Sequence, residues 1–226
     1  MSAKRLEVQI DVLNRPNQRA LPLADLTPPE LIAAILQEFR DIEYLGVDGT
    51  DYCLLRSEDG MELDPTVELG EQLGAKPHLR LVERPLKVPS GAQRVEEGLY
   101  LREEAGGRVF RLAWLPAIVG RSDATLKGDE LVAANLESLP TGLRVSRRHI
   151  RVTGDGGQYF AECMSSNPAS LRRANGGTAA LGRTRQSLVS GDVLYLDRSE
   201  IALKFIVRSA QGETAQDESA STQAVE

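Results

Sequence analysis

Residues 98–208 consist of short apolar runs separated by glycine-rich turns, and this pattern restricts the fold more than any other feature of the chain. The turns contain paired glycines or Ser-Gly-Asp, and they lie at 106–107, 154–157, 175–177 and 190–192. The strand-like runs between them are 99–102, 108–115, 117–119, 149–152, 159–163, 193–196 and 201–207. Many short strands joined by such turns predict an all-β sandwich.

Residues 4–84 have a different pattern, in which strand-like and helical segments are mixed. Alternating apolar residues over 6–12 predict a half-buried strand, and 19–23 a returning strand after a turn at 14–17. Thr27, Pro28 and Glu30 form a helix start of the capping-box type, followed by an apolar helical face. Further strands are expected at 52–56 and 78–83. The segment is therefore predicted to be a small α+β domain.

This order of elements resembles a ubiquitin-like β-grasp domain, most of all those found with bacterial type VII secretion systems. The closest local similarity is the ending L-G-A-K-P-H-L-R-L at 73–81. The chain continues through Arg84-Pro85 and has no Gly-Gly end there, so the resemblance implies a docking module for a second, unnamed protein rather than a conjugated modifier. Residues 85–97, with two prolines and Ser-Gly, are predicted to be a short linker.

The net charge also changes between these two segments. Residues 4–84 carry 9 basic and 16 acidic side chains, a net charge of −7, whereas residues 98–208 carry 16 basic and 11 acidic side chains, a net charge of +5. An acidic first half and a basic second half indicate two units, the second of them suited to an anionic partner.

The basic half also contains the residues best suited to hold an anion. Gly120-Arg121, Ser146-Arg147 and Ser166-Asn167 supply guanidinium, hydroxyl and carboxamide groups, and His149 is the only titratable base among them. These groups indicate recognition rather than catalysis.

The ordered set G-R, S-R-x-H, S-x-N and a late G-D-x-L resembles that of a forkhead-associated (FHA) domain over 98–208. That family is a β-sandwich that binds phosphothreonine peptides through loops at one end. The resemblance implies that Arg121 and Ser146 hold the phosphate and that Arg147 and Ser166 assist. It further implies that Asn167 binds the peptide backbone, and that Gly120 and His149 are structural.

Two departures from the family pattern lie beside this set. Asn167 is followed by Pro168-Ala169 instead of Gly-Thr, and proline fixes φ and removes a donor, so Asn167 is expected to be tilted. Arg121 and Ser146 are separated by 24 residues, about ten more than the family usually has. Residues 127–144 are therefore expected to form an extended loop that gives the site an unusual ligand preference.

These observations favour a non-enzymatic signalling adaptor in the cytoplasm, since neither a signal peptide nor a membrane span is visible. Its FHA half would bind a protein phosphorylated on threonine, either a Ser/Thr kinase or its substrate. No cofactor or metal is expected, because two histidines and two distant cysteines make no credible site. The oligomeric state is not indicated.

Three alternatives remain. One is a structural protein with a degenerate FHA site that binds partners without phosphate, which Pro168 favours. A second is nucleic-acid binding, against which the scarcity of aromatic residues speaks. An enzyme is the weakest alternative, because neither histidine has a nucleophile at a recognisable spacing. The arginines available to a nucleic acid are Arg144, Arg147, Arg148, Arg151, Arg172, Arg173, Arg183 and Arg185.

Residues 209–226 are polar, acidic and free of aromatics, and are expected to be a disordered tail. Thr214 is followed by Asp217 at +3, a spacing that some FHA domains favour. A phosphorylated Thr214 bound by the FHA site of a second copy is therefore a hypothesis.

Overall fold

The computed structural model describes residues 4–208. Thr214 and the rest of the acidic tail lie outside the described residues. The chain divides between Leu86 and Lys87 into two compact units.

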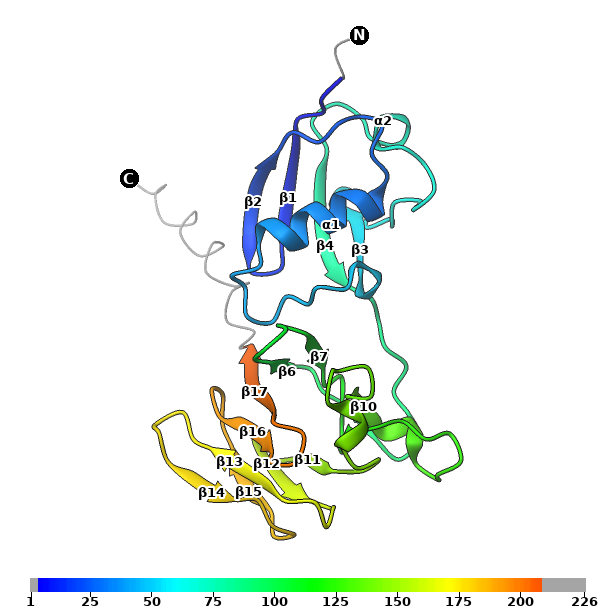
Figure 1. The fold of residues 1–226 in the computed structure, drawn as a ribbon. Coiled ribbons are helices and arrows are strands. Elements are labelled where there is room, and N and C mark those ends of the chain that lie inside the picture. The colour runs from blue at the N-terminus through cyan, green and yellow to red at the C-terminus, as the bar shows by residue number, and fades with distance from the viewer. Residues whose placement is uncertain (1–3, 209–226) are drawn as a thin grey trace, which may run out of the picture. The chain divides into compact units, whose positions relative to one another are not determined.

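The first unit is a mixed four-stranded sheet with strand order β2-β1-β4-β3. Its central pair, β1 and β4, is parallel, and the two outer pairs are antiparallel. Figure 1 shows the helix α1 lying across one face of this sheet. The elements are β1 (Val8–Val12), β2 (Arg15–Ala20), α1 (Pro28–Glu38), the 3₁₀ turn η1 (Gly49–Asp51), β3 (Tyr52–Arg56), α2 (Leu69–Gln72) and β4 (His78–Glu83).

Helix α1 begins at the predicted capping box. The backbone N–H and the hydroxyl of Thr27 both donate to Glu30 Oε2, each at 2.8 Å, and these bonds hold the pKa of Glu30 below its usual value. The apolar face of α1 packs on the sheet, where Leu31, Ile32 and Ile35 are buried with Val8 and the other core residues. The cap therefore sets where the helix starts, and the apolar face sets which side it buries.

The hairpin differs from the prediction of a turn at 14–17. The turn lies at Leu13 and Asn14, and β2 already begins at Arg15. Pro16 is tolerated inside this strand because β2 is an edge strand and its register with β1 is irregular between Arg15 and Gln18, so Pro16 has no paired residue. Asn17 has a positive φ of 56°, and its N–H donates to Asp11 Oδ1 at 2.8 Å. The chain thus enters the strand several residues earlier than the turn signal suggests.

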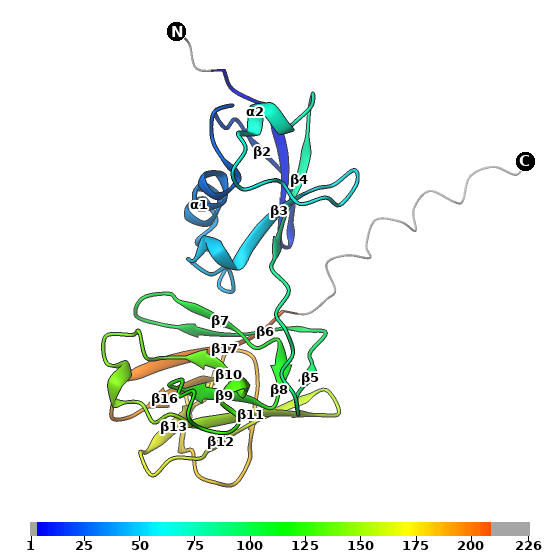
Figure 2. The same ribbon diagram turned by 90° about the vertical axis from the view of Figure 1, so that its right-hand side faces the viewer.

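The second unit is an all-β sandwich. One sheet has the order β10-β9-β11-β12-β15, and the other has the order β14-β13-β16-β17-β6-β7. Figure 2 shows β9 and β11 in a layer separate from β6 and β17. The elements are β5 (Gln93–Arg94), β6 (Gly98–Glu103), β7 (Val109–Arg111), β8 (Trp114–Leu115), β9 (Ala117–Gly120), η2 (Asp129–Leu131), β10 (Val132–Asn135), η3 (Gly142–Arg144), β11 (Ile150–Asp155), β12 (Gln158–Cys163), β13 (Ala169–Arg172), β14 (Thr178–Ala180), β15 (Gln186–Leu188), β16 (Val193–Leu196) and β17 (Ile201–Arg208).

The core of the second unit lies between the two sheets. Leu101 on β6 and Phe205 on β17 are fully buried in one cluster with Val119 on β9 and Ile150 on β11. Burying such side chains on both inner faces stabilises each by roughly 1.5–3 kcal/mol relative to exposure. This packing fixes the strand ends from which the loops of the candidate site extend.

Part of the predicted linker belongs to the second unit. Residues 93 and 94 form β5, which pairs with β8, and the Val95 N–H donates to Ala113 O at 3.1 Å. The prediction of a linker over all of 85–97 is therefore too long at its C-terminal end. Backbone pairing, which composition does not reveal, orders these residues.

The stretch 127–144 is also not a loop throughout. Residues 132–135 form β10, which adds to the sheet beside β9 in parallel register. The segment therefore contributes an edge strand and only then returns as η3. The 3₁₀ turns η2 and η3 lie on either side of this strand, so the segment is not one extended loop.

Candidate functional site

Several loops at one end of the sandwich surround a cavity of about 520 Å³. They follow β9, precede β11, join β12 to β13 and join β16 to β17. Among residues 4–208, three arginines and no carboxylate line the cavity, so it is suited to an anion. The lining residues are Arg121, Leu143, Arg144, Val145, Ser146, Asn167 and Arg198.

Arg121 is anchored from the end of β9 against the segment that carries Ser146. Its backbone N–H donates to Ser146 O at 3.2 Å, and its Nε donates to Val145 O at 2.6 Å. The Nε bond uses one of the five N–H groups of the guanidinium. The side chain is therefore held in place while most of its donors remain for a ligand.

Gly120 allows the two segments to approach each other. A Cβ at this position would lie 2.3 Å from Arg147 O and 2.8 Å from Ser146 O, closer than any side chain can be placed. The backbone of residues 146 and 147 thus packs directly on Gly120. The role of Gly120 in this structure is to leave room for that backbone.

Ser146 and Asn167 meet through their side chains. Asn167 Nδ2 donates to Ser146 Oγ at 3.0 Å, and Ser146 Oγ lies 2.6 Å from Ser165 Oγ. The Asn167 N–H donates to Ser165 Oγ at 2.9 Å. These bonds join the loop before β11 to the loop after β12, and they position a hydroxyl and a carboxamide at the cavity.

Arg198 holds the other end of the same carboxamide. Arg198 lies on the turn between β16 and β17, and its Nη1 donates to Asn167 Oδ1 at 2.9 Å. Asn167 therefore donates through Nδ2 and accepts through Oδ1 within the protein. Pro168 is accommodated in this arrangement, and its carbonyl accepts the Asp197 N–H at 3.3 Å.

His149 lies beneath the site and does not line the cavity. It is 1% exposed, and its Nε2 is 3.1 Å from Asn167 O, an arrangement in which an Nε2–H donates to the carbonyl. Burial is the main cause that holds the pKa of His149 below its usual value, so the ring is neutral near pH 7. The bond to Asn167 O ties the buried ring to the loop that carries Asn167, which is a structural role.

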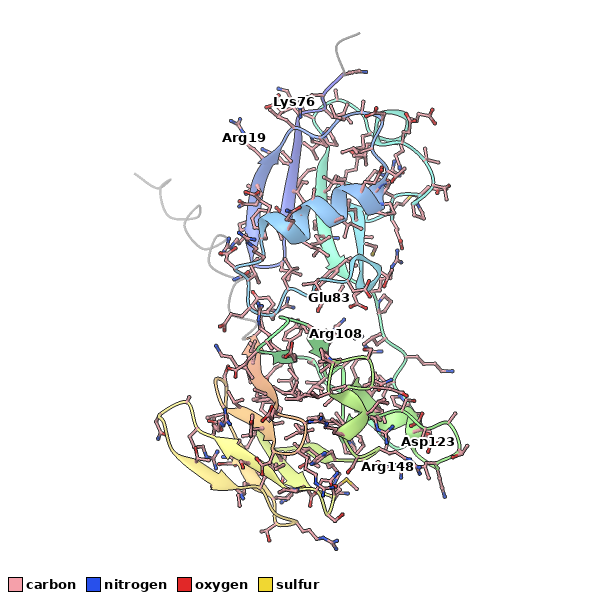
Figure 3. The ribbon with its side chains drawn as sticks, in the orientation of Figure 1. Arg19, Lys76, Glu83, Arg108, Asp123 and Arg148 are labelled. Atoms are coloured by element: carbon pink, nitrogen blue, oxygen red, sulfur yellow. The ribbon has the colours of Figure 1, made fainter. Side chains whose placement is uncertain are left out.

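Two residues expected to assist are placed elsewhere. Arg147 Nε forms an ion pair with Asp123 Oδ2 at 3.0 Å, outside the lining of the cavity. Ser166 is exposed and also does not line it. Figure 3 labels Asp123, on the segment that follows β9, and Arg148, whose side chain donates to Lys127 O of the same segment. The structure thus brings Arg121, Ser146 and Asn167 together, without Arg147 or Ser166.

Other lining residues were not selected from the sequence. Arg198 comes from a turn far along the chain and had no motif to mark it. Leu143 and Arg144 belong to η3, and Arg144 had been considered only for a nucleic acid. Ser165, the serine of the S-x-N motif, does not line the cavity, but its Oγ lies 2.6 Å from Ser146 Oγ and accepts the Asn167 N–H.

Most of the arginines considered for nucleic acid are engaged by this chain's own side chains. Arg151 pairs with Glu162 at 2.5 Å, and Arg173 pairs with Asp192 at 2.9 Å. Arg172 and Arg185 lie over the rings of Tyr195 and Phe160, at 3.5 and 4.8 Å from the ring centroids. Stacking of this kind occupies the aromatic faces that a single-stranded nucleic acid would use.

Among residues 4–208, no group of three or more histidine, cysteine, aspartate or glutamate side chains is arranged to hold a metal ion. Within the same range no helix has both the length and the apolar character needed to cross a membrane.

Comparison with known proteins finds similarity among solved structures only. Neither a protein-family model nor a curated protein matches the sequence. The FHA domain of human APLF in complex with an XRCC1 bisphospho peptide is 23% identical, over 48% of this chain and 97% of that one, with a TM-score of 0.35. The FhaA FHA domain is 24% identical, over 49% and 99%, with a TM-score of 0.35. Mycobacterium tuberculosis EmbR in complex with a low-affinity phosphopeptide is 22% identical, over 50% and 25%, with a TM-score of 0.38.

Proposed function

We propose that the second unit is an FHA domain that binds proteins phosphorylated on threonine. The observation that carries the proposal is the meeting of Arg121, Ser146 and Asn167 at one cavity, whose lining contains no carboxylate from the described part of the chain. A phosphate monoester carries a charge of about −1.5 to −2 at pH 7 and three strong acceptor oxygens. Guanidinium, hydroxyl and carboxamide donors on loops of a rigid sandwich match these acceptors.

The first unit is proposed to be a ubiquitin-like β-grasp domain that docks a second protein. Its element order, its mixed sheet with β1 beside β4, and a capped helix across one face support this assignment. The chain as a whole would then be a non-catalytic cytoplasmic adaptor that joins a phosphorylated protein to another component. Residues 4–84 and 98–208 are the proposed domains, and a type VII secretion-like system is the proposed setting.

Calorimetric titration of the full chain with phosphothreonine peptides tests this function. Arg121→Ala and Ser146→Ala should each weaken binding about tenfold or more, because each removes a hydrogen bond to a charged group. A suitable control is Gly182→Ala, since a Cβ at Gly182 would lie in open space. Equal affinity for phosphorylated and unphosphorylated peptide would favour the alternative of a phosphate-independent interaction protein.

A further inference from the structure

Arg198 occupies a defined place at the cavity. It lies on the turn that joins β16 to β17, and this turn is fixed to its surroundings on both sides. Thr141 Oγ donates to Ser199 O at 2.5 Å, and Asp197 Oδ1 accepts from Ser170 Oγ at 2.9 Å. The Arg198 side chain is exposed, so its free N–H groups can reach a ligand in the cavity that it lines.

The bonds around Arg198 determine where hydrogens point in the site. Arg198 Nη1 donates to Asn167 Oδ1, which leaves Nδ2 of the same amide to donate to Ser146 Oγ. Because Ser146 Oγ accepts this bond, its own hydrogen is available to point elsewhere. It can donate to Ser165 Oγ, 2.6 Å away, although either hydroxyl of this pair can be the donor, or to a phosphate oxygen when a ligand is bound. Arg198 thereby prepares Ser146 as a donor.

Arg147, by contrast, is held in an ion pair outside the cavity. Its Nε is 3.0 Å from Asp123 Oδ2, and the Asp123 carboxylate also accepts two bonds from Thr125, which hold its pKa below the usual value. A carboxylate that stays ionised keeps the guanidinium paired. Moving Arg147 to a ligand would therefore break an ion pair, whereas the side-chain partner of Arg198 within residues 4–208 is the neutral amide of Asn167.

We propose that Arg198, and not Arg147, is the second guanidinium that binds the phosphate, together with Arg121. The inference rests on the proposed function and assigns the residue that completes its site. In this arrangement a phosphate is approached by Arg121 from the end of β9, by Ser146 from the opposite loop, and by Arg198 from the turn after β16. Two guanidiniums balance the charge of about −2 that a phosphate monoester carries.

The test compares two variants that each remove one positive charge, Arg198→Gln and Arg147→Gln. Each full-length variant is titrated by calorimetry with the phosphothreonine peptide that the wild-type chain binds best in a peptide screen. Arg198→Gln should weaken binding about tenfold or more, as loss of a charge-assisted hydrogen bond does. Arg147→Gln should stay within about twofold of the wild type. Equal losses in the two variants, or a loss in Arg147→Gln alone, would overturn the inference.

A double substitution distinguishes direct contact from an effect transmitted through Asn167. In an Asn167→Ala background, Arg198→Gln should still weaken binding, because the guanidinium itself contacts phosphate. No further loss in that background would mean that Arg198 acts only on Asn167, and would refute the direct contact. Arg198→Lys keeps the charge and should recover part of the affinity, which a merely misfolded variant would not do.

Failure of the proposed function would look different. In that case the wild-type chain itself would not distinguish the phosphorylated peptide from its unphosphorylated form. If instead the wild type distinguishes them and Arg198→Gln binds as tightly as the wild type, the function stands and only the assignment of Arg198 falls.

Discussion

Replacing Gly120 by alanine is expected to damage both the fold of the second unit and its binding site. The added Cβ would lie 2.3 Å from Arg147 O and 2.8 Å from both Arg147 C and Ser146 O. Ordinary contacts at such positions are 3.4–4 Å, so the backbone at 146 and 147 would have to retreat by about 1 Å. That movement would stretch the Arg121 N–H to Ser146 O bond, which is already 3.2 Å long.

Overpacking of this kind typically costs about 1–3 kcal/mol. At about 4 °C per kcal/mol for a domain of this size, Tm should fall by about 4–12 °C. Trp114 is the only tryptophan of the chain and is buried in the second unit, so its fluorescence reports unfolding of that unit alone. Phosphopeptide affinity should fall about tenfold or more, because Arg121 and Ser146 lose their relative positions.

Gly182→Ala is the matched control, since a Cβ at Gly182 meets no atom within 4 Å. It should leave both the Trp114 transition and the affinity near the wild-type values. If Gly120→Ala behaves like Gly182→Ala in both assays, the close approach of the two segments does not organise the site, and the reasoning fails.

Other predictions concern the histidine, the helix cap and the thiols. Because burial holds the folded pKa of His149 below its unfolded value of about 6.5, stability contributed by the neutral ring is complete above that pH and is lost as pH falls below it. The Trp114 transition should therefore move to lower temperature between pH 7.5 and 5.5, and His149→Asn should reduce this dependence; an unchanged dependence would contradict the assignment. Thr27→Ala removes the hydroxyl bond to Glu30 and should destabilise α1 by about 0.5–2 kcal/mol. The measurement is amide hydrogen exchange in 30–38, which should be faster in the variant, whereas equal exchange rates would show that the cap contributes little. Cys53 and Cys163 are buried and free, and burial is the main cause that raises the pKa of Cys53, so alkylation of the native chain should be slow at both and reach two thiols only after denaturation.

Local signals in the sequence were sufficient for features that are themselves local. The capping box predicted the start of α1 because Thr27 and Glu30 interact over one helical turn. The turn at 14–17 was misplaced because Pro16 reads as a turn residue, whereas an edge strand accepts it. The pairing of β5 with β8 and of β10 with β9 depends on partners far away in the chain, and composition does not identify them.

The residues of the site also differ in whether a local motif identifies them. Arg121, Ser146 and Asn167 were found by an ordered set of short motifs, and they line one cavity. The resemblance to FHA domains implied an assisting role for Arg147, but its side chain pairs with Asp123 outside the cavity. Arg198 could not be found from the sequence, because only the turn after β16 brings it to Asn167.

Recognition of phosphate on threonine by this cavity can be measured by titrating the unmodified full-length chain with one peptide library in three forms: phosphothreonine, threonine, and glutamate in place of phosphothreonine. Binding of the phosphothreonine form alone, with no measurable binding of the other two, is the expected result, because the site's donors need the phosphate's charge and its three oxygens. Binding of all three forms with similar affinity would contradict the account.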